Sequence, residues 1–406
     1  MDYRTVLIIG GGAAGMMCAL RLADAGICDV AILERNDRLG KKLSATGNGQ
    51  GNITNSDMDA GHYCTSAPKT VAEILNAFGK QDLLSYLTEL GGCFAEGDEG
   101  KIYPSSFQAA SVTDIFRFAL QKRKVEVKTG ERVLQIGRNE NGFIVTTDKG
   151  KYASAYLVLA SGGAAAKHFG TDGGGYEHAK SMGHSVTQLF PALVRLKTER
   201  DKIKGLKGVR CAVEARLENN KDKSFRGDVI FTDFGIGGNI AYKLSSYAKS
   251  GDSVLLDFLP FTDREGLCSL LANKARNYPE MPAEDFLRCV VHSAVAKAIL
   301  NACGIPVSTK CSHLQKKIEE IVRQIKGYRL RIEGNTGFDD AQVTKGGIRM
   351  EEVDENLMSR IVRGLYFAGE ILDVDGECGG YNLQWAFSSG ARCAAAIAEA
   401  IANENR

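Results

Sequence analysis

The feature of this sequence that most constrains its fold is the opening stretch, where a short apolar run leads into closely spaced glycines. Residues 5–9 are aliphatic and rich in β-branched side chains, which predicts a buried strand. Gly10, Gly12 and Gly15 follow in G-x-G-x-x-G spacing, and the Ala-rich run 16–25 predicts a helix. In such a turn the first glycine permits the tight reversal, the second lets a pyrophosphate approach the backbone, and the third lets helix and strand pack closely.

An acidic residue at the end of the next predicted strand strengthens this interpretation. Residues 30–33 are again apolar and are followed by Glu34. In dinucleotide-binding domains an acid about 20 residues after the glycines binds a ribose hydroxyl, and Glu34 lies close to that position. Strand, glycines, helix, strand and acid together predict a dinucleotide site rather than an ordinary β-α-β turn. A loop rich in glycine and asparagine at 47–52 stands where a nicotinamide-binding domain more often has a third parallel strand, which favours FAD.

Length and composition limit the number of domains and the class of protein that the chain can form. With 406 residues the chain is expected to form two or three domains, and 44% hydrophobic and 25% charged residues are typical of a globular protein. The formal net charge of +2 argues against a nucleic-acid partner. No apolar run approaches the roughly 20 residues of a membrane span, and the N-terminus does not resemble a signal peptide. The 11 cysteines lack metal-site spacing, so we expect reduced thiols in a cytoplasmic protein and no metal.

A second glycine signature follows a small β-meander. Short strands are predicted near 125–128, 132–136 and 143–146, and a longer apolar strand at 155–160 leads into Ser-Gly-Gly at 161–163. A strand that ends in Ala-Ser-Gly-Gly is typical of FAD-binding α/β domains, where the glycines let the backbone pass close to the cofactor. A simple strand and turn has the same pattern, and both interpretations stay open at this point.

The middle of the chain changes character and predicts an insertion. Strand patterns at 209–217, 223–231 and 253–259 indicate a separate β module, and residues 263–325 are largely helical by pattern. The predicted organisation is a discontinuous FAD-binding domain at 1–192 and 341–406, a β module at 193–262 and a helical module at 263–340.

The final segment returns to the first domain. A short apolar strand ends at Gly369 and Glu370, Asp373 follows, and a glycine-led, Ala-rich helix begins near Tyr381 and Asn382. A buried strand that stops at Gly-Glu suits contact with phosphate or the ribityl chain. The N-terminus of the helix could face the flavin's pyrimidine edge and stabilise the negative charge of the reduced ring. A plain β-turn-α closure would leave the paired acids unexplained.

Short sequence blocks spread over nearly the whole chain carry a family resemblance. They lie at 10–15, 34–35, 40–43, 46–49, 52–55, 227–232, 235–236, 345–347, 364–376 and 379–382. On these blocks the chain resembles the HI0933/YhiN-like (BaiN-like) family of FAD-dependent oxidoreductases. The resemblance implies an α/β, Rossmann-like FAD-binding domain of the two-dinucleotide-binding type, interrupted by an inserted β-barrel-like and helical region. It also implies NADH or NADPH as electron donor and, by analogy with a member that acts on unsaturated bile-acid intermediates, the reduction of an activated C=C bond.

The resemblance also implies a set of cofactor-binding residues. These are Gly10, Gly12, Ala13, Ala14, Gly15, Glu34, Arg35, Lys42, Asn52, Val133, Gly162, Gly369, Glu370, Asp373, Gly380, Tyr381 and Asn382. This chain departs from the family at Gln50 and Gly51, where the family usually has Arg-Cys before the asparagine. If that arginine neutralises phosphate or reduced flavin, Lys41 or Lys42 must do so here. The remaining thiol near the flavin is Cys378, which we expect to be a small packing residue.

The expected reaction passes hydride from NAD(P)H through the flavin to a small organic substrate, with a proton from the protein. No motif identifies the acid, and the catalytic residues are unknown. Tyr103, Arg195 and Tyr381 are weak candidates, because each residue type is more often structural than catalytic. Lone histidines such as His184 are expected to be capping or surface groups.

Other functions fit the same sequence. The protein could be a flavin oxidase or hydroxylase, which would consume NAD(P)H in air and release peroxide. It could be a non-enzymatic flavin-binding or assembly protein, in which case no hydride donor would reduce its flavin efficiently. It could modify RNA, although the balanced charge disfavours this. The oligomeric state, the substrate and the choice between NADH and NADPH are not predicted.

Overall fold

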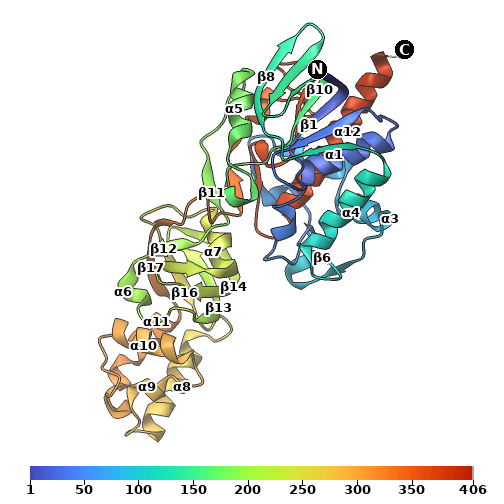
Figure 1. The fold of residues 1–406 in the computed structure, drawn as a ribbon. Coiled ribbons are helices and arrows are strands. Elements are labelled where there is room, and N and C mark those ends of the chain that lie inside the picture. Colours follow the sequence, from blue (N-terminus) through green and yellow to red (C-terminus); the bar gives the residue numbers. More distant parts are fainter. Residues whose placement is uncertain (405–406) are drawn as a thin grey trace. The chain divides into compact units, whose positions relative to one another are not determined.

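The computed structural model describes residues 1–404 and divides the chain into two compact units (Figure 1). The first unit combines residues 1–191 with the segment that begins at Ala341, and the second consists of Ala192–Asp340. The chain therefore leaves the first unit once and returns to it. As a result, strands from before and after the insertion pair in one sheet.

A seven-stranded sheet forms the centre of the first unit. Its strands are β1 (Asp2–Ile9), β2 (Val30–Glu34), β7 (Glu126–Thr129), β8 (Val133–Asn139), β9 (Gly142–Thr147), β10 (Lys151–Leu159) and β19 (Leu365–Phe367). They run in the order β7-β2-β1-β10-β9-β8, and β19 pairs with β10 beside this path. β1 is parallel to both β2 and β10, whereas β9 is antiparallel to β10. The parallel core explains why β2 is apolar up to its last residue, Glu34, since both faces are covered.

Two helices of the first unit pack closely because small residues separate them. α1 (Ala13–Asp24) follows β1, and α12 (Tyr381–Glu404) ends the described chain. A Cβ at Gly390 would collide with the backbone carbonyl of Ala14, so the two helix backbones approach where only glycine fits. The C-terminal helix thereby covers the helix that follows the first glycine turn.

The remaining elements of the first unit are short or peripheral. The helices are α2 (Pro68–Ala77), α3 (Lys80–Glu89), α4 (Ala109–Lys122) and α5 (Gly174–Ser181). Small strands pair as β3 (Thr54–Asn55) with β6 (Lys101–Pro104), β6 with β5 (Phe94–Glu96), β4 (Tyr63–Thr65) with β20 (Val374–Gly376), and β11 (Phe190–Ala192) with β18 (Val343–Lys345). Within residues 1–404, no helix combines the length and apolar character needed to cross a lipid bilayer.

A closed barrel forms the frame of the second unit. It is built from β12 (Leu196–Thr198), β13 (Arg210–Leu217), β14 (Asn220–Phe231), β15 (Gly235–Gly237), β16 (Ser253–Asp257) and β17 (Tyr328–Asn335). The strands close in the order β12-β15-β14-β13-β16-β17. Together with the sheet of the first unit, this barrel confirms the predicted fold class of a Rossmann-like α/β domain with an inserted barrel-like region.

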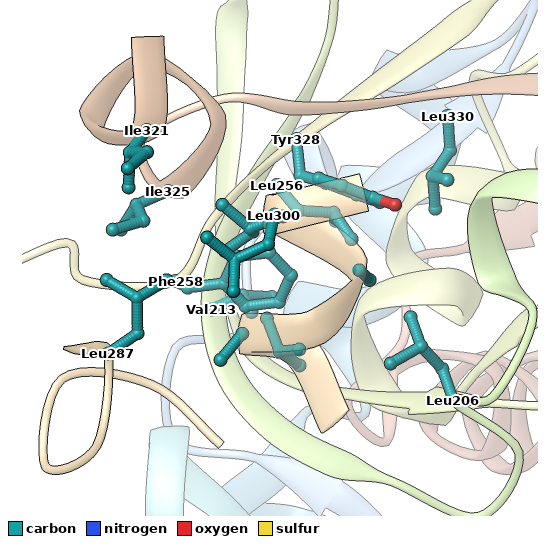
Figure 2. Close-up of a cluster of buried hydrophobic side chains, with 14 of the residues drawn as sticks. Leu206, Val213, Leu256, Phe258, Leu287, Leu300, Ile321, Ile325, Tyr328 and Leu330 are labelled. Carbon is teal, nitrogen blue, oxygen red and sulfur yellow. The ribbon is translucent and has the colours of Figure 1, made fainter. Parts of the chain in front are cut away.

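The helices of the second unit share one hydrophobic core with the barrel. They are α6 (Arg200–Ile203), α7 (Gly238–Ser245), α8 (Arg264–Asn277), α9 (Ala283–Phe286), α10 (Ser293–Ala302) and α11 (Ile318–Ile325). Figure 2 shows Val213 and Leu256 of the barrel in the same cluster as Leu300 and Ile325 of the helices. All four side chains are almost completely shielded from water.

The boundary inside the insertion differs from the sequence interpretation. Residues 263–340 were expected to form a helical module, but they include β17, which pairs with β12 and β16 and closes the barrel. The helices α8 to α11 therefore lie in the segment that connects the neighbouring barrel strands β16 and β17. Pairing of Leu196 with Asn335 joins strands more than a hundred residues apart, and a local pattern does not reveal such a partner.

Replacing Phe286 with alanine tests the shared core. Phe286 is fully buried, so F286A should lower the stability of the second unit by about 3 to 5 kcal/mol. Because the core is shared, hydrogen exchange should accelerate in β13 and β16 as well as in α9. The control is F261A, since Phe261 is 86% exposed. Exchange that accelerates only in the helices would show that the barrel has its own independent core.

Candidate functional site

The three glycines of the first turn have different surroundings. A Cβ at Gly10, where φ is +107°, would collide with the carbonyl of Ala160, and one at Gly15 would collide with the carbonyl of Gly10. These two glycines are required by the close packing of β1, β10 and α1. A Cβ at Gly12 would meet nothing within 4 Å. Gly12 is the N-cap of α1 and no side chain caps this helix, so its first N–H groups adjoin the open space at Gly12, as a bound phosphate requires.

The carboxylate of Glu34 is fixed beside this turn. Glu34 is 7% exposed, and its Oε2 accepts a hydrogen bond from the Gly11 N–H at 2.8 Å. Its Oε1 accepts from the backbone N–H and the side-chain amide of Asn36, at 2.8 and 2.7 Å. A carboxylate oxygen can accept more than one hydrogen bond, so this geometry orients Glu34 and leaves it capacity for a ribose hydroxyl.

Glu370 joins the second glycine signature to the first loop. Its Oε2 accepts from Lys42 Nζ at 2.7 Å, and its Oε1 accepts from the Thr344 N–H at 2.8 Å. Thr344 Oγ1 in turn accepts from the backbone N–H groups of Ala164 and Ala165. The predicted residues Lys42 and Glu370 therefore lie together, and a side chain from β18 fixes the loop that follows β10.

An unpartnered amide oxygen lies at the start of α12. A Cβ at Gly380, where φ is +99°, would lie 2.8 Å from Asn52 Oδ1. Asn52 is 8% exposed, and its Oδ1 has no hydrogen-bond partner among residues 1–404. A buried polar atom of this kind indicates a missing ligand, because unsatisfied buried groups are rare in folded proteins. The open space at Gly12 and the orphaned oxygen of Asn52 fit a bound FAD.

The side chains of Tyr381 and Asn382 serve the local fold. Asn382 Oδ1 accepts from the Gly376 N–H at 2.9 Å, and its Nδ2 donates to the Gly376 carbonyl at 2.7 Å. The Tyr381 ring stacks on His62 with centroids 4.4 Å apart, and the Tyr63 hydroxyl donates to the Tyr381 carbonyl. A cofactor contact at these two residues would thus come from the backbone at the N-terminus of α12, which stays a prediction.

Other predicted cofactor residues occupy different parts of the first unit. Arg35 pairs with Asp172 at 2.8 Å, Val133 begins β8, and Gly162 has a φ of +74° in the turn after β10. Gly369 has a φ of +79°. Ala13 and Ala14 are the first residues of α1. Asp373 is partly buried, and this burial raises the pKa of its carboxyl group. Whether these residues contact FAD stays a prediction.

The weak catalytic candidates come from separate segments of the chain. Tyr103 lies on β6 beside the Phe107 ring, with centroids 5.5 Å apart, and burial raises its pKa. Burial also raises the pKa of Tyr381 to about 12, which makes it a poor proton donor near neutral pH. Arg195 belongs to the second unit, where it pairs with Asp340 and lies over the Phe234 ring.

Two side chains behave differently from the sequence expectations. His184 is neither a cap nor a surface group, because it is 3% exposed and contacts Glu352 through Nδ1 and Ser359 through Nε2. Asp375 was not singled out, yet it is 5% exposed and its Oδ1 has no hydrogen-bond partner in the described chain. Its position between Asp373 and the glycine-led helix was the sequence signal that could have identified it.

The Gln50-Gly51 departure has a structural reason. Gly51 has a φ of +80°, and a Cβ there would lie 2.8 Å from the Ala109 Cα, so this loop conformation excludes a cysteine. The two lysines named as substitutes for the missing arginine are engaged with carboxylates. Lys41 pairs with Asp37 at 2.9 Å, and Lys42 pairs with Glu370.

The described residues 1–404 contain no disulfide and no group of three histidine, cysteine or acidic side chains that could hold a metal ion.

The variant Gly12→Ala tests whether the open space at Gly12 is needed for FAD binding rather than for the packing of the protein. The φ of −80° at Gly12 is accessible to alanine, so we expect the stability of the apo protein to change by no more than about 1 kcal/mol. The added methyl group would occupy the space for the pyrophosphate and weaken FAD binding by at least about tenfold, or about 1.4 kcal/mol. Fluorescence titration with FAD measures the dissociation constant. Gly150→Ala, at another position with nothing within 4 Å, is the control and should bind normally.

Glu34→Arg tests the ribose acceptor. A cation in this position would repel the N–H groups that now donate to the carboxylate, and the purified protein should contain little FAD. Glu34→Gln keeps the shape but loses the charge, and it should weaken FAD binding by roughly 1.5 to 3 kcal/mol. Asp37→Arg, in the same loop but exposed, is the charge-matched control. Wild-type affinity in both Glu34 variants would show that Glu34 is not the acceptor.

The chain has whole-length relatives. It is 36% identical to a 3-dehydro-bile acid delta(4,6)-reductase of Clostridium scindens, over 97% of this chain and 98% of the relative. It is 28% identical to a ribosomal RNA dihydrouridine synthase of Escherichia coli, again over 97% of this chain and 98% of the relative. The second relative means that the expected exclusion of a nucleic-acid partner is not supported.

Structural and family comparisons agree on the fold. A 3-ketosteroid-delta4-(5alpha)-dehydrogenase from Rhodococcus jostii superposes with a TM-score of 0.51 at 15% identity, covering 98% of this chain and 97% of that one. This likeness concerns the fold alone. The family model of the HI0933-like protein Rossmann domain matches residues 4–396. The chain therefore belongs to the HI0933-like family, and it is an FAD-dependent oxidoreductase.

Proposed function

We propose that this protein uses NADH or NADPH to reduce an activated C=C bond in a small organic molecule. The observation that carries the proposal is the 36% identity to a named C=C reductase, which extends over essentially the full length of both chains. The likeness thus includes the insertion as well as the nucleotide-binding unit. Conjugation to a carbonyl is what makes such a bond a hydride acceptor, so the substrate class is an enone.

Both whole-length relatives have names that describe saturation of a C=C bond. One removes the double bonds at positions 4 and 6 of a 3-oxo bile acid, and the other converts uridine to dihydrouridine. Each reaction adds one hydride and one proton across the bond. The shared chemistry supports the reaction class more strongly than either substrate.

The residues of the first unit have distinct tasks in this reaction. When bound, FAD accepts two electrons from the nicotinamide and supplies them as hydride to the substrate. Gly12 and the N-terminus of α1 would leave room and N–H groups for the pyrophosphate, and the Glu34 carboxylate, which the Gly11 N–H orients, would accept a hydrogen bond from the ribose. The Lys42–Glu370 pair fixes the loops around the cofactor. The N-terminus of α12, beside Asn52, would stabilise negative charge on the reduced ring.

Uridine in ribosomal RNA is a second candidate substrate, which the 28% identical relative favours. A small enone is preferred because the bile-acid reductase is more similar to this chain and because the formal net charge is only +2. RNA binding requires many contacts with phosphates and is strongly salt-dependent. Activity on RNA that falls steeply with salt would therefore distinguish the two substrates.

An anaerobic titration tests the proposal. Purified protein is titrated with NADH and, separately, with NADPH while the visible flavin band is recorded. We expect at least one donor to bleach the band, and a 3-oxo-Δ4,6 steroid to restore it. RNA containing uridine is the alternative acceptor.

Each outcome separates one function from the others. Restoration by RNA and not by the steroid would assign the second candidate. Bleaching followed by reoxidation only in air, with peroxide release, would indicate an oxidase. A flavin that neither donor bleaches would contradict the role of NAD(P)H and favour another electron source or a non-catalytic protein.

A further inference from the structure

A buried carboxyl group lies on the strand that leads to α12. Asp375 is the central residue of β20, it lies opposite Cys64 of β4, and it is 5% exposed. Its Oδ1 lacks a hydrogen-bond partner in the part of the chain that the structure describes. Keeping such an atom is unfavourable for folding, so its presence points to a ligand or a reaction that uses it.

The surroundings of Asp375 form a cluster of ionisable groups. Asp373 directly precedes β20 and its negative charge acts on Asp375, while a Cβ at Gly376 would lie 2.7 Å from the Tyr381 Cβ. β18 contacts β20 and contributes Lys345, whose positive charge acts on both carboxyl groups. Further groups that act on Asp373 are Thr187, Arg349 and Glu351.

These interactions make Asp375 a weaker acid than an ordinary aspartate. Burial raises the pKa of Asp375 to about 6, and the negative charge of Asp373 adds to this, while Lys345 opposes it. A large fraction of Asp375 is therefore protonated near pH 6, and this proton can be released. At Glu34 and Glu370, in contrast to the unpartnered Oδ1 of Asp375, both carboxylate oxygens accept hydrogen bonds.

We propose that Asp375 is the acid that protonates the substrate when its C=C bond is reduced. This inference rests on the proposed function and supplies the proton donor that the sequence did not identify. As hydride arrives at the carbon β to the carbonyl, the π electron pair moves toward the carbonyl and the α carbon takes the proton from the Asp375 hydroxyl. The two electrons come from the nicotinamide donor. The carboxylate that remains is stabilised by Lys345 and regains its proton from water.

Asp375→Asn is the variant that tests the proposal, because it keeps the shape and removes the acid. The bound flavin is reduced with dithionite, so that the result does not depend on the nicotinamide donor, and is mixed anaerobically with 4-androstene-3,17-dione or 2-cyclohexen-1-one. We expect D375N to retain wild-type FAD affinity and to be reoxidised about 10² to 10⁴ times more slowly than wild type. The rate at which the enone reoxidises the wild-type flavin should fall above about pH 6, and D375N should not show this decrease. Asp201→Asn, at an exposed site on α6, is the isosteric control.

The stability of the apo protein gives a readout that is independent of activity. Because the folded protein holds the Asp375 proton more tightly than the unfolded chain, this residue contributes a loss of stability as pH rises from about 4 to about 6. D375N lacks this contribution. Its midpoint of thermal unfolding should therefore exceed that of wild type at pH 8, and the difference should shrink toward pH 4.

Several results would overturn the proposal. Reoxidation of D375N at the wild-type rate would exclude Asp375 as the proton donor. Loss of FAD affinity in D375N would assign the residue to cofactor binding instead. If neither enone reoxidises reduced wild-type protein, the proposed function fails, and this inference fails with it. Wild-type turnover with an unimpaired D375N would overturn this inference alone.

Discussion

The arrangement of the first unit depends on the carboxylate of Glu370, which holds together segments that are far apart in the sequence. It accepts hydrogen bonds from Lys42 Nζ at 2.7 Å, from the Thr344 N–H at 2.8 Å and from the Gly163 N–H at 3.4 Å. The loop after β2, the turn after β10 and the strand β18 are thereby fixed to the end of β19. Breaking such a partly buried network leaves charges without partners, so the loops around the cofactor site depend on this one group.

Packing and ligand binding make different demands on neighbouring glycines. Gly10, Gly15 and Gly390 are needed because backbone atoms approach too closely for a Cβ. Gly12 faces open space, so its missing side chain serves a ligand rather than the fold. The same contrast appears among the buried and half-buried acids. Glu34 and Glu370 are satisfied by hydrogen bonds and organise the site, whereas the Oδ1 of Asp375 lacks a partner within residues 1–404, as a group that takes part in chemistry would.

The sequence predicted those features whose causes are local. The glycine turn and the acid after the second strand depend on spacing and periodicity within short windows. Closure of the barrel by β17 was not predicted, because its partners are distant in the chain. The environments of His184 and Asp375 were not predicted for a similar reason, since burial and the charge of Lys345 arise only when separate strands come together.

The most direct test of the account is analysis of the product formed from a 3-oxo-Δ4,6 steroid under anaerobic conditions. We expect a product heavier than its substrate by two hydrogens for each molecule of NADH or NADPH that is oxidised, with no oxygen consumed. Oxidation of the donor that requires air and leaves the steroid unchanged would contradict it.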